Sequence, residues 1–218
     1  MRRPLPAAAL LAGVLLMAGA SGAQTGLLEA AARGDLAAVN RLIAAKADLE
    51  QRDGQRQTAL LLAVAGNHVA VAKALLAAGA NPNAQASNQD TPWLLAGASG
   101  RTEIIAAMLP LKPDLTIRNR YGGNALIPAC ERAHVETAKL LLTSGIDVNH
   151  VNNLGWTCLL EIVILGDGGP RHQEVARLVL AAGADPNLAD KDGVSPLQHA
   201  RKRGQSEIAR LIAAAGGR

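Results

Sequence analysis

Two markers recur along this chain with a shared period of 33 residues, and this repetition restricts the fold more than any other feature. The first marker is a Thr, Ser or Asn two residues before an apolar residue, at Thr58, Thr91, Asn124, Thr157 and Ser195. The second marker follows an apolar segment, at Asp48, Asn81, Asp114, Asp147 and Asp185. Both series advance by 33, 33, 33 and 38 residues. Self-similarity at such a period predicts stacked structural repeats.

Each repeat is expected to form two short helices. The Thr or Ser at its start can cap the first helix, and Pro92 and Pro196 suit a first turn, in which no N–H is lost. Gly100 ends one first helix and Gly79 ends one second helix, because glycine tolerates a positive φ. The sequence therefore predicts an all-α solenoid of about six helix-turn-helix units joined by hairpin-like loops. The units run over residues 26–52, 53–85, 86–118, 119–151, 152–189 and 190–217.

The composition excludes several other classes of protein. Aromatic residues make up 1% of the 218 residues, which argues against β-sandwiches and barrels. The same scarcity removes the stacking platforms of proteins that bind single-stranded nucleic acid. The net charge is +4, and Arg2 and Arg3 at the N-terminus supply two of these charges. We therefore expect no nucleic-acid partner.

Residues 1–23 have the three parts of a secretory signal peptide. Arg2 and Arg3 precede an uncharged apolar run over 4–20, and small residues precede a cut after Ala23. The run is short for a membrane span, which needs ~20 residues. An uncleaved anchor and a twin-arginine signal are the alternatives. We expect a cleavable signal, export to the periplasm, no membrane insertion after cleavage, and a monomer.

The repeats resemble the ankyrin repeat, which opens on T-P-L-H-x-A and closes on G-A-D-x-N. The matching segments are Ser195-Pro196-Leu197-Gln198-His199-Ala200 and Gly183-Ala184-Asp185-Pro186-Asn187. The resemblance covers about residues 25–217 and implies that the concave surface of the stack binds protein partners. The chain departs from the family at the His of the opening motif, where Leu61, Leu94, Ile127, Leu160 and Gln198 stand. The histidine network of the family is therefore not expected.

The hairpin tips and the adjoining ends of the first helices are the predicted contacts with a partner. Tyr121 and Trp156 fall at the tips of neighbouring units, and Tyr, Trp and Arg dominate the binding energy of interfaces. Trp156 has an alternative role as scaffold, packed on the next tip. Trp93 stands at a Leu position of its unit and is expected in the core. The other predicted contact residues are Leu154, Glu131, Arg132, Asn88, Asp90, Asp192 and Lys202.

The five extra residues of the fifth unit lie within residues 166–173, where Gly and Pro predict a loop. Loops on rigid scaffolds often carry recognition, so Asp167, Arg171 and His172 are candidate ligand contacts. Glu161, on the helix before this loop, is expected to cap or bridge the backbone N–H groups of the loop. A hydrolase or metal-binding protein that uses this loop is an alternative, and it requires a pocket there.

The histidines and cysteines do not form a recognisable catalytic or metal site. The five histidines are spread over four units, and no pair has the i, i+4 spacing of helical metal ligands. Cys130 and Cys158 are expected to be two small buried thiols. Their unit offset suggests a separation of at least one helix spacing, beyond the ~7 Å Cα limit of a disulfide.

These observations predict a non-catalytic protein-protein interaction module in the periplasm, with no cofactor and no metal. Two alternatives concern the partner that such a module binds. The chain looks like some bacterial periplasmic ankyrin proteins linked to protection against peroxide, which would make it an accessory to a periplasmic oxidative-stress enzyme. The second alternative is that the chain is an immunity-type inhibitor of a secreted toxin.

Overall fold

The structure is a computed structural model that describes the backbone of residues 19–218 and the side chains of residues 26–218. Residues 1–18 of the expected signal peptide lie outside this described part, and the signal peptide stays a prediction. No helix in the described part is long and apolar enough to cross a membrane.

Helices α1 to α12 and one 3₁₀ helix make up the regular structure of residues 19–218, without strands, which confirms the predicted all-α fold of about six helix pairs. The first helices of the pairs are α1 (Gly19–Arg33), α3 (Ala59–Ala65), α5 (Pro92–Ala98), α7 (Leu126–Glu131), α9 (Cys158–Leu165) and α11 (Pro196–Lys202). The second helices are α2 (Leu36–Ala44), α4 (Val69–Ala77), α6 (Thr102–Met108), α8 (Val135–Leu142), α10 (Pro170–Ala181) and α12 (Ser206–Ala214), and η1 (Leu109–Leu111) follows α6.

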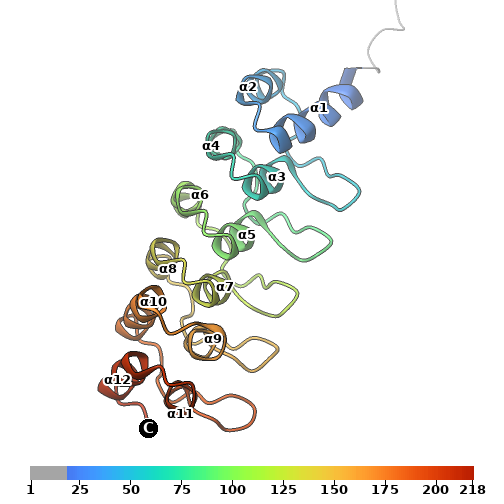
Figure 1. Cartoon of the computed structure of the whole chain (residues 1–218). Coiled ribbons are helices and arrows are strands. Elements are labelled where there is room, and N and C mark those ends of the chain that lie inside the picture. Colours follow the sequence, from blue (N-terminus) through green and yellow to red (C-terminus); the bar gives the residue numbers. More distant parts are fainter. Residues whose placement is uncertain (1–18) are drawn as a thin grey trace, which may run out of the picture.

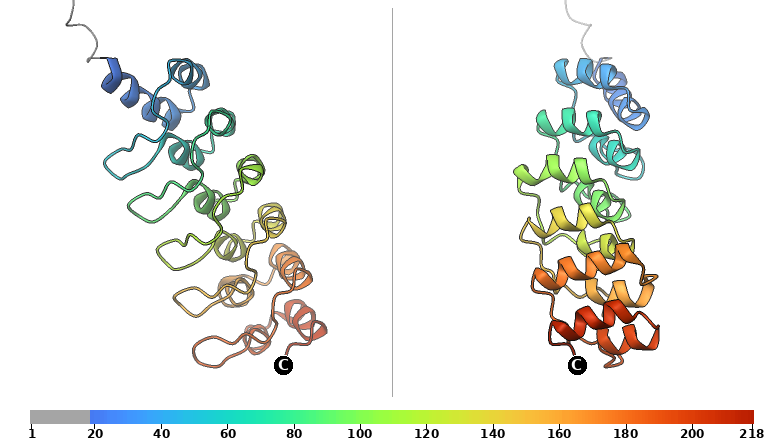
Figure 2. Two further views of the ribbon diagram at one scale, coloured as in Figure 1. Left: turned by 180° about the vertical axis from the view of Figure 1, so that it is seen from behind. Right: turned by 60° about the vertical axis from the view of Figure 1, so that its left-hand side comes forward.

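The helix pairs stack in one row. The first helices lie between the second helices and a series of loops that project from one edge of the row (Figure 1). The views from behind and from the side show the same single row (Figure 2). The buried apolar residues form one cluster from Leu27 to Ile212, because each repeat buries its apolar face against its neighbours. Trp93 lies in this core, as predicted, with 1% of its surface exposed.

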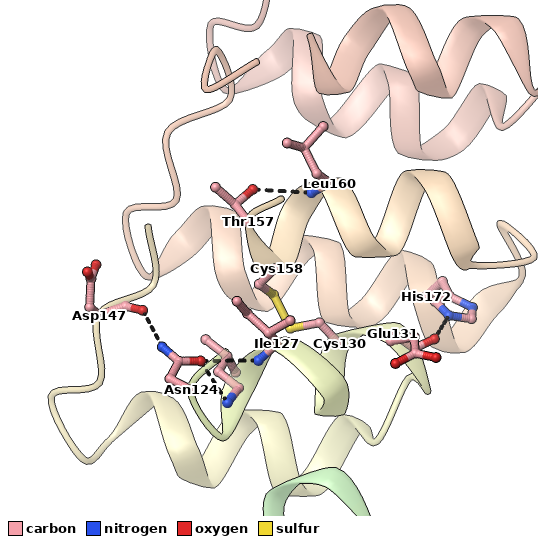
Figure 3. The surroundings of a disulfide bond; sticks show 10 residues. Asn124, Ile127, Cys130, Glu131, Asp147, Thr157, Cys158, Leu160 and His172 are labelled. Atoms are coloured by element: carbon pink, nitrogen blue, oxygen red, sulfur yellow. Dashed lines mark hydrogen bonds between the residues drawn. A yellow bond between two sulfur atoms is a disulfide. The ribbon is translucent and has the colours of Figure 1, made fainter. Parts of the chain in front are cut away.

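Side chains cap the first helices as predicted. Each capping oxygen accepts a hydrogen bond from the backbone N–H three residues on, at 3.1–3.3 Å, and the caps are Thr58, Thr91, Thr157 and Ser195. Asn124 stands in place of the fifth cap. Its Oδ1 accepts from the N–H groups of Leu126 and Ile127, and its Nδ2 donates to the Asp147 carbonyl at 2.9 Å (Figure 3). Asn124 therefore caps α7 and also ties it to the turn after α8.

Polar side chains before the second helices join each unit to the one before it. His68 Nε2 lies 3.0 Å from the Ala32 carbonyl, and Gln205 Nε2 donates to the Gly166 carbonyl at 3.1 Å. Burial lowers the pKa of His134, although a hydrogen bond to the Ala98 backbone opposes this shift. Through these contacts His68 and His134 belong to the scaffold.

The prediction of two free thiols is wrong, because Cys130 and Cys158 form a disulfide with a Cα–Cα distance of 5.6 Å. Cys130 lies near the end of α7 and Cys158 at the start of α9 (Figure 3). The prediction took the ~8–10 Å spacing of helix axes as the separation of the two residues, but Cα atoms lie ~2.3 Å from their axis, so residues that face each other across two helices are closer than the axes. One unit earlier the same positions hold Gly97 and Ala125, where a Cβ on Gly97 would lie 2.6 Å from the Ala125 oxygen.

The prediction of a loop over 166–173 is also wrong, since most of the five extra residues lengthen a helix. Helix α10 begins at Pro170 and has 12 residues, whereas α4 and α12 have 9 each. Pro170 suits the first position of a helix, where its missing N–H has no partner to lose. The connection from α9 to α10 is therefore only residues 166–169.

Candidate functional site

A cavity of about 260 Å³ lies between two neighbouring loops and the helices α7 and α9 beside them. We call it the tip cavity, and the lining residues used below are Tyr121, Leu154, Leu165, Glu131 and Glu161. Four residues predicted from the sequence as partner contacts line it, namely Tyr121, Leu154, Glu131 and Arg132. The structure therefore brings together candidates from two successive units.

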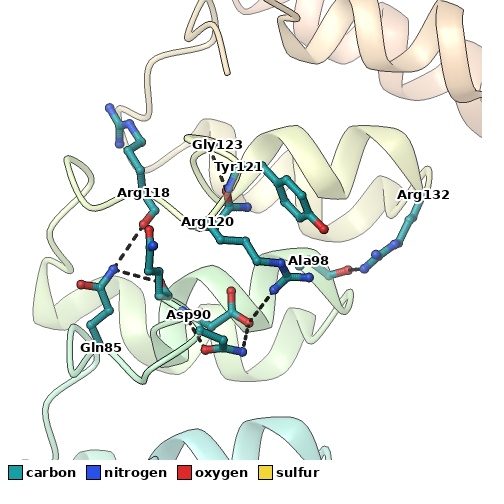
Figure 4. A network of polar contacts seen from close by, with 11 residues as sticks. Gln85, Asp90, Ala98, Arg118, Arg120, Tyr121, Gly123 and Arg132 are labelled. Atoms are coloured by element: carbon teal, nitrogen blue, oxygen red, sulfur yellow. Dashed lines mark hydrogen bonds and ion pairs between the residues drawn. The ribbon is translucent and has the colours of Figure 1, made fainter. Parts of the chain in front are cut away.

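Tyr121 stands exposed at the rim of the cavity on a firmly held loop. The Asn119 Oδ1 accepts hydrogen bonds from the N–H groups of Tyr121 and Gly123, each at 2.9 Å. The Arg120 guanidinium lies 4.6 Å from the centroid of the Tyr121 ring and 3.8 Å from the Asp90 carboxylate (Figure 4). A cation at this distance from an aromatic ring is attracted by it. The ring is thus oriented although 54% of the residue is exposed.

Apolar side chains gather around the tip cavity. The large apolar residues exposed in the described part of the chain are Leu36, Leu111, Tyr121, Val151, Leu154 and Leu165. Three of these line the cavity, and Leu154 and Leu165 are each 50% exposed. Contiguous exposed apolar surface marks binding sites on soluble proteins. The clustering distinguishes this cavity from single exposed apolar residues elsewhere.

Glu161 is a buried carboxyl group at the floor of the cavity, with 4% of its surface exposed. Its Oε1 accepts a hydrogen bond from Asn152 Nδ2 at 2.8 Å. Burial and the nearby charge of Glu131 raise the pKa of Glu161 to about 7, against the lowering effect of the Asn152 hydrogen bond. Glu161 therefore bridges to the preceding hairpin rather than to residues 166–173 as expected. Its place in a row that holds Leu62 and Leu95 in earlier units is the sequence signal that points to it.

The other charged side chains at the cavity have partners of their own or lie half-buried. Arg132 Nη1 donates to the Ala98 carbonyl at 2.6 Å (Figure 4). Glu131 is half-buried at the end of α7, and its carbonyl lies 3.0 Å from His172 Nε2 (Figure 3). Arg120 faces Asp90, as described above, and within residues 26–218 neither arginine forms an ion pair with Glu131 or Glu161.

The remaining predicted contact residues lie outside the tip cavity. Trp156 is half-buried and packs against the core cluster. Asp90 accepts from Asn88 Nδ2 at 2.9 Å, and desolvation raises the pKa of Asp90 despite the opposing charge of Arg120. Asp192 and Lys202 are exposed on the last unit. These residues stay predictions for a larger contact surface.

Asp167, Arg171 and His172 hold the turn between α9 and α10. His172 Nδ1 lies 2.7 Å from Asp167 Oδ1, and Arg171 Nε donates to the Ala133 carbonyl at 3.1 Å. The Gly169 N–H and His172 lower the pKa of Asp167. A cavity of about 280 Å³ lies beside these residues, but in the part of the chain that the structure describes no group of three His, Cys, Asp or Glu could hold a metal ion.

Comparison with known proteins matches the chain to ankyrin repeat proteins. A family model described as "Ankyrin repeats (3 copies)" matches residues 27–119, 79–152 and 94–190. The ankyrin repeat protein YahD of Escherichia coli (strain K12) is 48% identical over 114 residues, which are 52% of this chain and 57% of that protein. The chain thus matches little more than half the length of this relative.

Solved structures extend the match to most of the chain. An ankyrin repeat domain from Acinetobacter baumannii AYE (ABAYE2397) superposes with a TM-score of 0.85 at 49% identity, over 88% of this chain and 98% of that chain. A match from the complex of the Bdellovibrio bacteriovorus endopeptidase Bd0816 with the immunity protein Bd3460 has a TM-score of 0.72 at 23% identity, over 87% of this chain and 97% of that chain. The second match shows the fold alone.

Proposed function

The chain belongs to the ankyrin repeat family, and from this premise we propose that it is a non-catalytic module that holds a partner protein at its tip cavity. The observation that carries the proposal is the gathering of Tyr121, Leu154 and Leu165 around one cavity between successive loops. Stacked repeats present extended concave surfaces that bind other proteins. An exposed tyrosine held in one orientation is suited to anchor a partner, since Tyr is enriched among the residues that dominate interface energies.

We further propose that the mature chain acts after export to the periplasm. The arrangement of residues 1–23 supports this proposal, as does the disulfide between Cys130 and Cys158. Disulfides persist in oxidising compartments and are rare in the cytosol. The partner is then another protein of the same compartment.

Photocross-linking tests the proposed binding surface. A benzoylphenylalanine in place of Tyr121 or Leu154 is expected to cross-link a partner protein in the cells that make this chain, because both positions line the tip cavity. Leu111, which is 47% exposed on η1, provides a control position of similar exposure away from the cavity. Mass spectrometry of the cross-linked bands identifies the partner. Equal cross-linking from position 111, or none from positions 121 and 154, would contradict the proposal.

A further inference from the structure

We propose that the tip cavity accepts one basic side chain of the partner, whose cation pairs with Glu161 and Glu131 while its aliphatic stem lies against Leu154 and Leu165. This inference rests on the proposed function and specifies the chemistry of the partner at that site. It follows from an incompletely paired buried carboxyl group, from a second carboxyl group beside it, and from the apolar rim.

The buried carboxyl group of Glu161 has one satisfied oxygen. Asn152 Nδ2 donates to Oε1, and Asn152 Oδ1 in turn accepts from the N–H groups of Leu154 and Trp156, each at 3.0 Å. Within the described residues, Asn152 provides the one side-chain hydrogen bond that this carboxyl group accepts. Oε2 is not one of the buried side-chain atoms that lack a partner, so it keeps access to solvent at the cavity. A ligand in the cavity can therefore donate to this oxygen.

Glu131 places a second carboxyl group on the same cavity. Glu131 and Glu161 both line the cavity, and the charge of Glu131 raises the pKa of Glu161. Within residues 26–218 no ion pair involves either glutamate. The two arginines of the cavity are committed to Asp90 and to the Ala98 carbonyl (Figure 4). The two carboxyl groups therefore favour a cation from outside the chain.

The apolar rim fits the stem of such a side chain. Lys and Arg bury their methylene groups along apolar surface and keep the charged end at a polar site. Leu154 and Leu165 supply the apolar surface, and the carboxyl groups lie deeper, on α7 and α9. An acidic side chain would be repelled by Glu131. An apolar side chain would close the cavity over Glu161 without supplying a donor.

The affinity for a basic side chain should depend on pH. A cation favours the ionised form of Glu161, so its entry releases a proton when the carboxyl group was neutral before binding. Affinity is then full above about pH 7 and falls as the pH drops below it. The other ionisable groups on the elements packed against α9 and around the cavity are Arg120, Tyr121, Glu131, Arg132, Arg171, His172, Glu174, Arg177, His199, Arg201 and Lys202. Of these, Glu131 is the one whose charge shifts the pKa of Glu161.

Selection of random peptides displayed on phage tests this inference with the full chain as bait. We expect the wild type at pH 8 to recover peptides that share one Lys or Arg position. The variant with Glu131→Gln and Glu161→Gln should recover peptides without that preference, since both amides keep the shape of the cavity. A variant with Glu103→Gln and Glu136→Gln, two exposed carboxyl groups on α6 and α8, is the matched control and should select as the wild type does.

A recovered peptide and its analogue with norleucine at the basic position then quantify the effect by calorimetry. We expect at least tenfold weaker binding for the norleucine analogue at pH 8 and a smaller ratio at pH 5.5. Peptides recovered without a basic position, or the same preference in the double Gln variant, would overturn the cation site and leave the proposed function standing. If every peptide recovered by the wild type is also recovered by the Tyr121→Ala variant, or if none is recovered, the result would contradict both the cation site and the proposed function.

Discussion

Replacing Cys130 and Cys158 together by Ala is expected to lower the free energy of unfolding by about 3–4 kcal/mol. The disulfide closes a loop across a sequence separation of 28 residues, and a loop of that length constrains the unfolded chain by about this amount in the chain-entropy model. For a chain of this size the melting temperature should fall by roughly 10 °C. Urea and thermal unfolding followed by circular dichroism measure both quantities.

Reduction provides the control for this prediction. Dithiothreitol should lower the stability of the wild type towards that of the double Ala variant and should leave the variant unchanged. The helix content of the folded variant should stay the same, because the stack is held by the apolar cluster on both sides of the disulfide. Identical unfolding curves of the wild type with and without reductant would show that the bond contributes nothing to stability.

The Glu161→Gln variant is expected to be more stable than the wild type at pH 8. Folding raises the pKa of Glu161 from 4.5 to about 7, so its ionised form is disfavoured in the folded chain. Its contribution to stability is therefore fully present below pH 4.5 and is lost as the pH rises to about 7. At 1.36 kcal/mol for each unit of pKa, the loss is at most about 3 kcal/mol. Gln retains an oxygen that can accept the Asn152 hydrogen bond.

Urea unfolding at pH 5 and pH 8 measures this effect as the difference between variant and wild type. The difference should be small at pH 5 and largest at pH 8. Glu136→Gln changes an exposed carboxyl group on α8 and should show no such dependence. Parallel pH profiles for the wild type and Glu161→Gln would contradict a buried carboxyl group with a raised pKa at this position.

The fold could be predicted because its determinants are local and repeated. Thr58, Thr91 and Thr157 cap helices at the spacing that revealed the repeats, and Trp93 fills a position that is apolar in every unit. The disulfide could not be predicted from that spacing, because the period fixes equivalent positions and not which of them face each other across neighbouring helices. The equivalent pair one unit earlier, Gly97 and Ala125, is also in close contact, which appears only when α5 and α7 are packed.

The composition of residues 166–173 in the fifth unit also did not decide between a loop and a helix. Gly and Pro within 166–173 favour a loop, but a proline also suits the first turn of a helix, and Pro170 begins α10. His172 is consequently buried and bonds to Glu131, as His68 bonds to Ala32 in an earlier unit. The alignment of units alone did not reveal that His172 is equivalent to His68, because the extra residues precede His172 and shift its position in the unit.

The register of the repeats located much of the candidate site. Tyr121 and Leu154 are 33 residues apart, so they occupy the same place on adjacent tips and face one cavity. Trp156 corresponds to Gly123, which is buried at the base of its hairpin, and the indole therefore packs inward. The pairing of Glu161 with Asn152 required the structure, since it joins a helix to a hairpin side chain nine residues earlier.

The affinity of the partner for a chain that lacks the rim of the tip cavity shows most directly whether this cavity holds the partner. Once cross-linking has identified the partner, calorimetry should show at least tenfold weaker binding to the Tyr121→Ala, Leu154→Ala variant, because loss of one anchor costs roughly 2 kcal/mol or more. The melting temperature of this variant should be unchanged. The Leu36→Ala, Leu111→Ala variant, altered at exposed apolar residues outside the cavity, should bind as the wild type does. Equal affinity of all three proteins would contradict the account.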